Sequence, residues 1–231
     1  MKHIVVLTGA GISAESGIQT FRDADGLWEN HNVQDVASPE GFQRDPEMVL
    51  RFYNERRKQL LTVEPNAAHF ALAKLEKAYK VTIITQNIDD LHERGGSTNI
   101  IHLHGELLKS RSVKNPTKTY DCRGDINLGE KAPDGGQLRP FIVWFGEGVP
   151  MISDASMAVQ SADIILVIGS SMQVYPAAGL VGLAGNNVPV TYIDPKPALN
   201  YEMQINKNLT VIEERATVGV PEVVEKLLAN V

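Results

Sequence analysis

A glycine-rich turn near the start of the chain is the first feature that could bind a ligand. An apolar run leads directly into residues 9–14, GAGISA, which fit the pattern Gly-x-Gly-x-x-Ala. Glycines in this pattern let the backbone approach a pyrophosphate, and free N–H groups at the start of a following helix can bind its oxygens. The turn therefore predicts phosphate or dinucleotide binding, with an ordinary glycine-rich strand end as the alternative.

A nicotinamide-dependent dehydrogenase would need a further signal that this turn lacks. In such enzymes an acidic residue at the end of the next strand, about 20 residues on, binds the ribose of the cofactor. The corresponding span here is FRDADGLWENHNVQD, whose acidic residues lie in loop-like sequence. The sequence therefore does not favour hydride transfer.

Polar side chains follow two later apolar runs. Gln86, Asn87 and Asp89 follow one of them, and His104 follows the next. Residues at the carboxyl ends of buried strands lie where open α/β sheets bind ligands, and a histidine there can take a proton from a hydroxyl. Each group also has a structural explanation, since Asn87 and Asp89 could cap a helix and a lone histidine is commonly a satisfied structural group.

A metal site at these histidines is a further alternative. His102 lies two residues before His104, so both would point to the same face of a strand. A His-x-His pair would need more ligands, and the obvious candidates are Asp121 and Cys122 in an unplaced loop. Cys122 is the only cysteine, which excludes a multi-cysteine metal site and agrees with a reducing cytoplasm, where we expect the protein.

Short apolar runs must form the strands that position these groups. Most of them lack alternation, as expected for strands buried on both faces of a parallel sheet. The runs are Ile4–Leu7, Val81–Thr85, Ile100–Leu103, Ile142–Trp144, Ile164–Ile168, Val190–Ile193 and Leu209–Ile212. Helical patterns lie between several of them, including one that opens at Asn66. The alternation predicts an α/β fold with a doubly wound, Rossmann-like parallel sheet.

Two segments interrupt this alternation. Residues 23–62 carry helical signals but no strand, and residues 109–139 are polar and rich in turns. We predict that together they form a smaller second domain, separated by a cleft from a large domain at about 1–22, 63–108 and 140–231. The whole chain would then be one catalytic unit.

Composition and charge exclude other classes of protein. Hydrophobic residues make up 43% and charged residues 22% of the 231 residues, which is typical of a folded globular chain. The net charge of -6 argues against a nucleic-acid partner. The uncharged stretch 164–193 is broken by Gly and Pro into pieces too short to cross a bilayer, so no membrane partner is expected.

Six strings of sequence, taken together, resemble the sirtuins, the NAD-dependent protein-lysine deacylases. They are GAGISAESGIQTFRD, TQNIDDLHERGG, HLHGEL, VWFGEGVP, VIGSSMQVYPAAGL and YIDPKP, and they follow the family's order over nearly the whole chain. The resemblance implies that the carbonyl oxygen of an acylated lysine attacks the ribose carbon of NAD as nicotinamide leaves. His104 would then take a proton from a ribose hydroxyl, with Asn87 and Asp89 as further catalytic residues. The implied products are free lysine, nicotinamide and O-acyl-ADP-ribose.

The resemblance also implies which residues bind NAD and the acylated protein. Asp89 would bind the carboxamide of nicotinamide, and Phe21 would shield the reacting sugar. The implied NAD-binding residues are Gly9, Ala10, Gly11, Ser13, Ala14, Phe21, Arg22, Gln86, Asn87, Ile88, Asp89, Gly169, Ser170, Ser171, Asp194 and Ala216. The substrate peptide would add a strand between two loops. Its implied contacts are Val143, Phe145, Gly146, Glu147 and Val174.

A Tyr-x-x-Arg pair resembles the one in sirtuins that accept succinyl- and malonyl-lysine. Tyr53 and Arg56 would share one face of a helix, where Arg can bind a carboxylate bidentately. Ala37 matches the small residue that leaves room for the longer acyl group in those members. We therefore expect desuccinylase and demalonylase activity beside deacetylase activity. The alternative is that Arg56 and Arg57 form a solvated basic pair.

The chain departs from the family at its zinc module. Most sirtuins bind a structural zinc with four cysteines, whereas this chain has Cys122 alone and Ser112 about where the first cysteine would fall. We predict no zinc. Gln19 replaces the usual proline, and Asp194 stands where asparagine is common. Two other functions stay open, an ADP-ribosyltransferase and a non-catalytic module that binds ADP-ribose or acyl-lysine.

Overall fold

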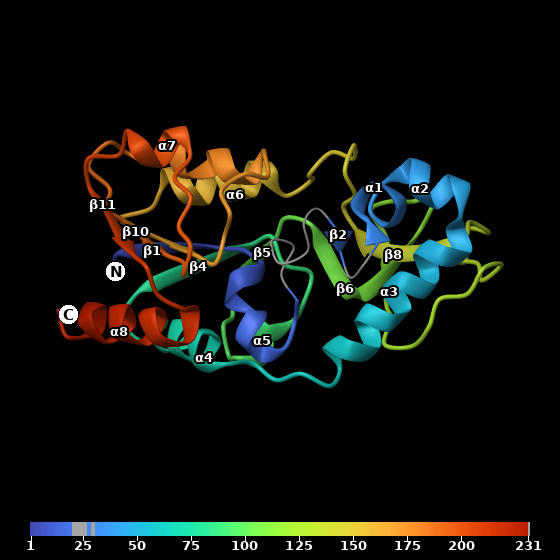
Figure 1. Ribbon diagram of the computed structural model, residues 1–231, viewed down its shortest axis with the longest axis horizontal. Helices are drawn as coiled ribbons and strands as arrows, with labels where there is room; N and C mark the ends of the chain where they lie inside the picture. The colour runs from blue at the N-terminus through green and yellow to red at the C-terminus, as the bar shows by residue number, and fades with distance from the viewer. Residues whose placement is uncertain (20–26, 29–30, 231) are drawn as a thin grey trace.

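The computed structural model describes residues 1–19, 27–28 and 31–230, and its largest element is a six-stranded parallel sheet (Figure 1). The order across the sheet is β11-β10-β9-β1-β4-β5, and every neighbouring pair is parallel. The strands are β1 (His3–Thr8), β4 (Lys80–Thr85), β5 (Ile100–His102), β9 (Ile164–Ile168), β10 (Val190–Ile193) and β11 (Leu209–Ile212). This confirms the predicted α/β fold class.

Successive residues of the central strand serve two different hydrophobic cores. Ile4 and Val6 point to a core shared with α4 (Ala67–Leu75) and α8 (Ala216–Leu228). Val5 and Leu7 point to a second core, shared with α6 (Ile152–Gln160) and the 3₁₀ helix η4 (Ala177–Leu183). Because both faces are covered, the strand has no polar face and its sequence cannot alternate.

Several helices begin where local chemistry predicts. Asn66 caps α4 by accepting a hydrogen bond from the N–H of Ala68, and Pro46 opens α3 (Pro46–Leu60) behind the cap Asp45. The apolar segment 175–184 contains the 3₁₀ helix η4. The remaining helices are α1 (Val33–Val36), α2 (Pro39–Arg44), α5 (Leu91–Arg94) and α7 (Tyr201–Gln204).

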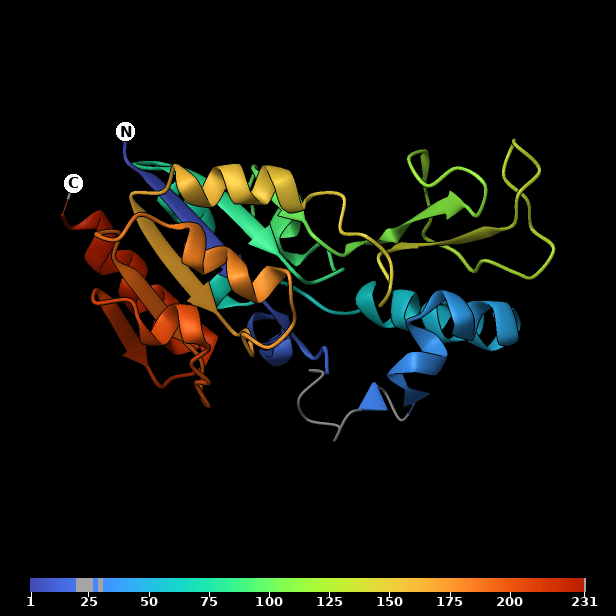
Figure 2. The ribbon, with the colours of Figure 1, turned by 90° about the horizontal axis from the view of Figure 1, so that it is seen from above.

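A smaller unit lies beside the parallel sheet and has its own antiparallel sheet (Figure 2). This sheet has the order β7-β6-β8, and α1, α2 and α3 pack beside it. Its strands are β6 (Gly105–Ser112), β7 (Thr119–Asp121) and β8 (Leu138–Ile142). Trp144, Phe52 and Tyr53 lie in its core.

Two predictions about this smaller unit are wrong. The run Ile142–Trp144 is not a strand of the parallel sheet, because β8 ends at Ile142 and pairs antiparallel with β6. The segment 23–62 does contain strand, namely β2 (Leu27–Trp28) and β3 (His31–Asn32). The antiparallel sheet also extends past both ends of the predicted segment 109–139. An apolar run shows that a strand is buried, but not which sheet it joins.

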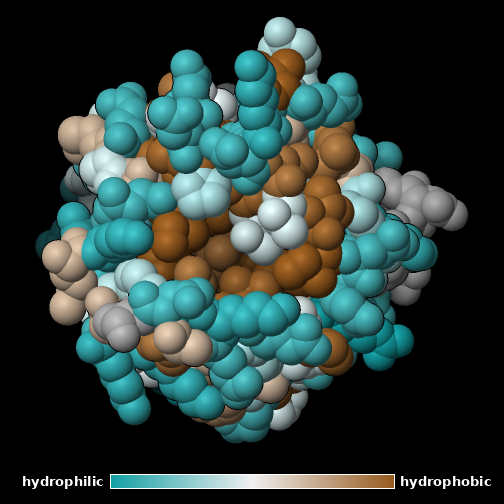
Figure 3. Space-filling model, turned by 90° about the vertical axis from the view of Figure 1, so that its left-hand side faces the viewer, coloured by the Kyte–Doolittle hydropathy of each residue, from teal (hydrophilic) through white to brown (hydrophobic). Residues whose placement is uncertain are grey.

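The two ends of the parallel sheet differ in character. The chain begins at the amino end of β1, and α8 ends nearby (Figure 1). Figure 3 views this end of the molecule and shows apolar side chains gathered in a central hollow within a hydrophilic rim. The carboxyl ends of β1 and β4 face the smaller unit instead. The polar loops that follow these two strands meet there. Within the described residues, no helix has the length and apolar character needed to span a bilayer.

Candidate active site

Two backbone turns pack against each other where β1 and β9 end. The N–H of Gly9 donates to the carbonyl of Ile168 (3.1 Å), and the N–H of Gly11 donates to that of Gly169 (2.8 Å). A Cβ on Gly11 would lie 2.6 Å from the Cα of Gly169, and one on Gly9 would lie 2.8 Å from its carbonyl oxygen. Gly169 itself has a φ of +59°. Glycine is therefore required at all three positions, because a side chain at any of them would push the two turns apart. We call this pair of packed turns the glycine cradle.

The chain after the first glycine turn is not the α-helix that the sequence predicts. It forms two short 3₁₀ helices, η1 (Ala10–Ile12) and η2 (Ala14–Ser16). Gly17 ends the second with a φ of 98°, so the turn cannot continue as a regular helix. Ser13 lies at the junction of the two, with its side chain buried.

A buried polar network joins the β1 turn to the loop after β4. The hydroxyl of Ser13 donates to Oδ2 of Asp89 (3.0 Å). The side-chain amide of Asn87 donates to the carbonyl of Gly9 and to the hydroxyl of Ser13, both at 3.2 Å. Side chains far apart in the sequence thus fix one another, as an orienting network for a polar ligand requires.

Asp89 combines a structural and a chemical role. Its Oδ1 accepts from the N–H of Leu91 (3.1 Å), the first residue of α5, although the capping position itself is occupied by Asp90. Burial raises the pKa of Asp89 to about 6, although the hydrogen bonds from Leu91 and Ser13 oppose the shift. The carboxyl group is therefore poised between its charged and neutral forms near physiological pH, and each form can bind an amide.

His104 is held as a neutral base. Its Nδ1 donates to the carbonyl of Gln86 (3.0 Å), so in the neutral ring Nε2 carries the lone pair. Burial lowers the pKa of His104, with the Gln86 hydrogen bond opposing, and this favours the neutral form at pH 7. The side chain of Gln86 in turn donates to the hydroxyl of Ser170 (3.0 Å). The loops after β4, β5 and β9 are thereby connected.

Arg56 and Asp89 line the same pocket. This pocket has a volume of about 50 Å³, and Ile18, Trp28 and Ile88 contribute to its wall. The guanidinium carbon of Arg56 lies 5.3 Å from the centre of the Phe52 ring. A basic and an acidic side chain therefore line one pocket.

Comparison with known proteins agrees with this arrangement. Residues 9–176 match the Sir2 family. An NAD-dependent protein deacylase of Helicobacter pylori (strain ATCC 700392 / 26695) is 54% identical over 99% of this chain and 98% of that protein. One from Bacteroides thetaiotaomicron is 52% identical over 99% of each. A Sir2 homologue solved with NAD has a TM-score of 0.88 at 36% identity, covering 99% of this chain and 90% of that one.

The chain belongs to the Sir2 family. The resemblance found in the sequence motifs is thus confirmed for the family as a whole. A Sir2 structure with a p53 peptide and NAD+ is also similar, with a TM-score of 0.80 at 32% identity over 98% of this chain and 93% of that one.

The Tyr-x-x-Arg pair of this sirtuin is only partly brought together. Tyr53 is fully buried, and its hydroxyl accepts a hydrogen bond from the indole N–H of Trp144 (2.9 Å). Burial raises the pKa of Tyr53. The pocket lined by Arg56 does not include Tyr53 among its described lining residues. Ala37 is buried nearby, and its carbonyl accepts from the N–H of Phe145 (2.9 Å).

The burial of Arg57 excludes the alternative that Arg56 and Arg57 form a solvated basic pair. Its side chain is buried and donates to the carbonyls of Leu107 (3.0 Å) and Gly124 (3.2 Å) and to the side-chain oxygen of Asn54 (2.8 Å). Arg57 therefore ties α3 to the antiparallel sheet, whereas Arg56 reaches the pocket.

The carboxylate of Glu147 faces the interior of the smaller unit. It accepts hydrogen bonds from Arg139 (2.8 Å), Arg111 (3.0 Å) and the backbone N–H of Trp144 (2.9 Å). Burial alone would raise the pKa of Glu147, but Arg139, the N–H of Trp144 and Arg111 together outweigh it and leave that pKa lowered. Only the backbone of Glu147 is left for the predicted peptide contact. Arg139 and Arg111 were missed because nothing near them in the sequence marks their partner.

The alternative of a His-x-His metal pair is not supported. His102 and His104 bond to different groups, since Nε2 of His102 lies 2.7 Å from Glu93. Among the described residues, the group of potential ligands around His102 contains Glu93 and Glu106 rather than His104, Asp121 or Cys122.

The remaining predicted contacts lie around the same edge of the sheet or outside the described residues. Asp194 is buried at the end of β10 and accepts from the N–H of Lys196 (2.8 Å). Ala216 begins α8, which contacts η1. Val174 accepts through its carbonyl from the N–H of Ala178 (2.9 Å). The predicted contacts Phe21 and Arg22 lie outside the described residues.

Hydrogen bonds organise the loop where other sirtuins place zinc ligands. Ser112 is buried, and its hydroxyl donates to Asp134 (2.8 Å) while accepting from the N–H of Lys114 (3.0 Å). Cys122 lies 3.5 Å from the carbonyl of Gly124. These contacts are all polar contacts between residues of the segment 112–134 itself.

Proposed function

We propose that this sirtuin is an NAD-dependent protein-lysine deacylase that removes acetyl, succinyl and malonyl groups. Its products would be free lysine, nicotinamide and O-acyl-ADP-ribose. The observation that carries the proposal is the neutral His104 at the sheet edge that also holds the glycine cradle and the buried Asp89. Relatives at 54% and 52% identity are named NAD-dependent protein deacylases, which supports it.

The backbone cradle suits the diphosphate of NAD. The Cβ positions of Gly9, Gly11 and Gly169 are all blocked by backbone atoms of the facing turn, so glycine lets the two turns pack together at the sheet edge, where their main chain would bind a pyrophosphate. When bound, NAD would supply the electrophilic ribose carbon and the nicotinamide leaving group. Ser170, Ser171 and Asp194 would contact its ribose and diphosphate groups.

His104 would act as the general base. Because its Nδ1 donates to Gln86, its Nε2 is the atom that accepts the proton of a ribose hydroxyl. Such general-base assistance contributes roughly 10²–10⁴-fold to a rate. A lowered pKa keeps His104 unprotonated for this task.

Asn87 and Asp89 would bind the nicotinamide end. The network with Ser13 fixes both side chains, so an amide ligand would meet them in a preset geometry. Their burial also removes water from the reacting ribose, which limits simple hydrolysis of NAD.

Arg56 would bind the carboxylate of a succinyl or malonyl group. It lines a pocket together with Asp89, so a negatively charged acyl chain entering beside the nicotinamide end would meet its guanidinium. The small side chain of Ala37 would leave space for that chain. Tyr53 would support this pocket from behind, through its ring contact with Trp28, rather than touch the carboxylate itself.

Acylated proteins would bind as extended peptides between two loops. Val143, Phe145 and Gly146 would form one side and Val174 the other, with backbone hydrogen bonds to the peptide. The exposed ring of Phe145 supports a contact at this surface. The two units described above would act as large and small domains, without the four-cysteine structural zinc of most sirtuins. A cytoplasmic location is part of the proposal, supported by the single cysteine.

One assay tests the proposal. The protein is incubated with NAD and with acetyl-, succinyl- or malonyl-lysine peptides, and the products are identified by mass spectrometry. We expect unmodified peptide, nicotinamide and acyl-ADP-ribose in equal amounts. A gain in peptide mass would instead indicate ADP-ribosyl transfer, and saturable binding without product would indicate a binding module.

A further inference from the structure

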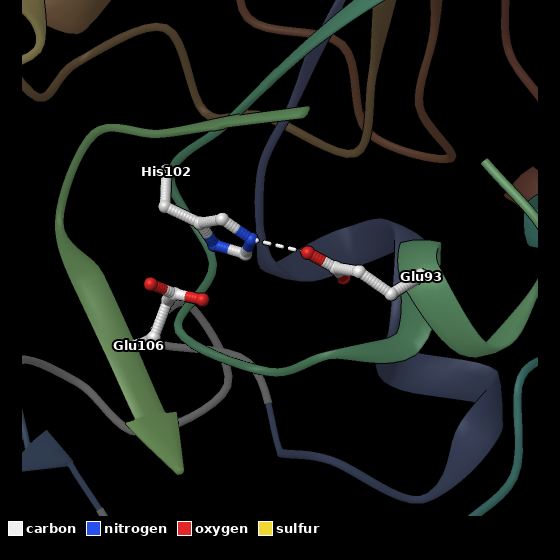
Figure 4. A group of neighbouring side chains, drawn as sticks. All are labelled: Glu93, His102 and Glu106. Carbon is white, nitrogen blue, oxygen red and sulfur yellow. Dashed lines mark hydrogen bonds and ion pairs between the residues drawn. The ribbon is translucent and has the colours of Figure 1, made fainter. Parts of the chain in front are cut away.

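Three potential metal ligands meet beside the candidate active site. They are Glu93 on α5, His102 at the end of β5 and Glu106 on β6. One ligating atom from each lies within 4.8 Å of the others. Figure 4 shows the carboxylates of Glu93 and Glu106 beside the imidazole of His102.

The imidazole of His102 is oriented by a group outside this cluster. Its Nδ1 lies 3.4 Å from the carbonyl of Asn87, and its side chain is only 10% exposed. Metal-binding histidines commonly donate their second nitrogen to a backbone carbonyl in this way, which directs the other nitrogen at the ion. Nε2 already faces Oε1 of Glu93 at 2.7 Å.

A cavity of about 280 Å³ opens next to these ligands. Glu93 and Glu106 line it, and so do Asp90 and Asp121. An ion held by the three residues would therefore have room for water ligands. Asp121 could approach it through one of them.

We propose that Glu93, His102 and Glu106 form a binding site for a divalent transition-metal ion of the zinc type. The ligands would be Nε2 of His102 and one carboxylate oxygen from each glutamate. One imidazole with two carboxylates suits Zn²⁺, Co²⁺ or Ni²⁺ better than Ca²⁺ or Mg²⁺, which prefer oxygen ligands alone. Metal–ligand bonds of about 2.0–2.2 Å require the side chains to move together by small rotamer changes.

Two groups compete with the ion. The first is the proton that His102 shares with Glu93: burial lowers the pKa of His102, but the charges of Glu93 and Glu106 outweigh burial and leave that pKa raised. The ion must replace this proton, so its binding weakens as the pH falls. The second is the ammonium group of Lys109, which lies 2.7 Å from Oε2 of Glu106. Removal of Lys109 should therefore tighten metal binding.

Titration of the metal-free full chain with Co²⁺ at slightly alkaline pH tests the site, read by visible absorption, with Zn²⁺ followed by calorimetry. We expect one ion per chain in the wild type and in the control Glu222→Gln, whose residue is exposed on α8. Glu93→Gln and Glu106→Gln should each weaken binding at least about tenfold. His102→Asn should abolish the Co²⁺ spectrum, and Lys109→Gln should tighten binding.

Folding of each variant is checked by thermal melting with and without Zn²⁺, because a bound ion raises the melting temperature only where the site is intact. If His102→Asn does not fold, the metal affinities of the two glutamate variants test the site instead. The site is refuted if the wild type binds neither ion at millimolar concentration, or if the glutamate variants bind as tightly as Glu222→Gln. Equal affinity for Mg²⁺ would refute the assigned class of ion. The spectrum needs neither NAD nor a peptide, so its failure leaves the proposed deacylase function untouched.

Discussion

Replacement of Arg56 by methionine should separate two activities of the proposed deacylase. Methionine keeps an unbranched apolar stem against Phe52, whose ring lies 5.3 Å from the guanidinium carbon, but it removes the charge from the pocket that Asp89 also lines. A hydrogen bond to a charged group contributes about 1.5–3 kcal/mol. Since each 1.36 kcal/mol is a factor of ten, kcat/KM for a succinyl-lysine peptide should fall about 10- to 150-fold.

Deacetylation supplies the internal comparison. An acetyl group has no carboxylate, so its kcat/KM should stay within about threefold of the wild type, because only packing contacts change. Arg51→Met is the matched control, since Arg51 lies on the same helix with its side chain exposed, and both activities should be unchanged in it. Steady-state rates for acetyl and succinyl peptides of one sequence provide the measurement. An equal loss of both activities in Arg56→Met would refute the role of its charge.

Three further predictions concern the base, the glycine cradle and acid stability. His104→Ala should lower the rate of product formation by about 10²–10⁴-fold, while NAD affinity measured by calorimetry stays within a few-fold; an unchanged rate would exclude His104 as the base. Gly11→Ala should lower the free energy of unfolding by about 1–3 kcal/mol in urea, because its Cβ would lie 2.6 Å from the Cα of Gly169; an unchanged urea midpoint would contradict this packing. Burial lowers the pKa of His69 to about 4, and its Nδ1 accepts a hydrogen bond only when unprotonated. The contribution of neutral His69 to the free energy of unfolding should therefore be complete above about pH 6.5. Up to about 3 kcal/mol of it should be lost as the pH drops to about 4. Urea midpoints of the wild type and His69→Gln across this range measure it, and parallel losses in both would assign the effect to other groups.

Strand positions were the part of the fold that could be predicted best. The predicted runs Ile164–Ile168, Val190–Ile193 and Leu209–Ile212 coincide with β9, β10 and β11. A strand covered on both faces needs apolar residues at every position, and this requirement is visible in any short window of sequence. The run Ile142–Trp144 has the same appearance, yet β8 ends at Ile142 and belongs to the other sheet.

The sequence predicts which loops form the candidate site, but not which side chains bond to one another there. Gln86, Asn87, Asp89 and His104 do gather at the carboxyl edge of the sheet, as the strand-end rule indicates. Nothing in the sequence around Glu147 reveals that Arg139 and Arg111 hold its carboxylate inside the protein.

The sequence by itself therefore determined most strands of the parallel sheet, the Gly-x-Gly-x-x-Ala turn and the family. Those features depend on conditions that hold residue by residue along the chain. Only the tertiary structure decided that Tyr53 bonds to Trp144 while Arg56 reaches the pocket. It also decided that His102 faces Glu93 rather than binding a metal ion together with His104. Such partners are chosen by the docking of elements far apart in sequence, where a rotation of one helix or strand brings a different side chain within bonding distance.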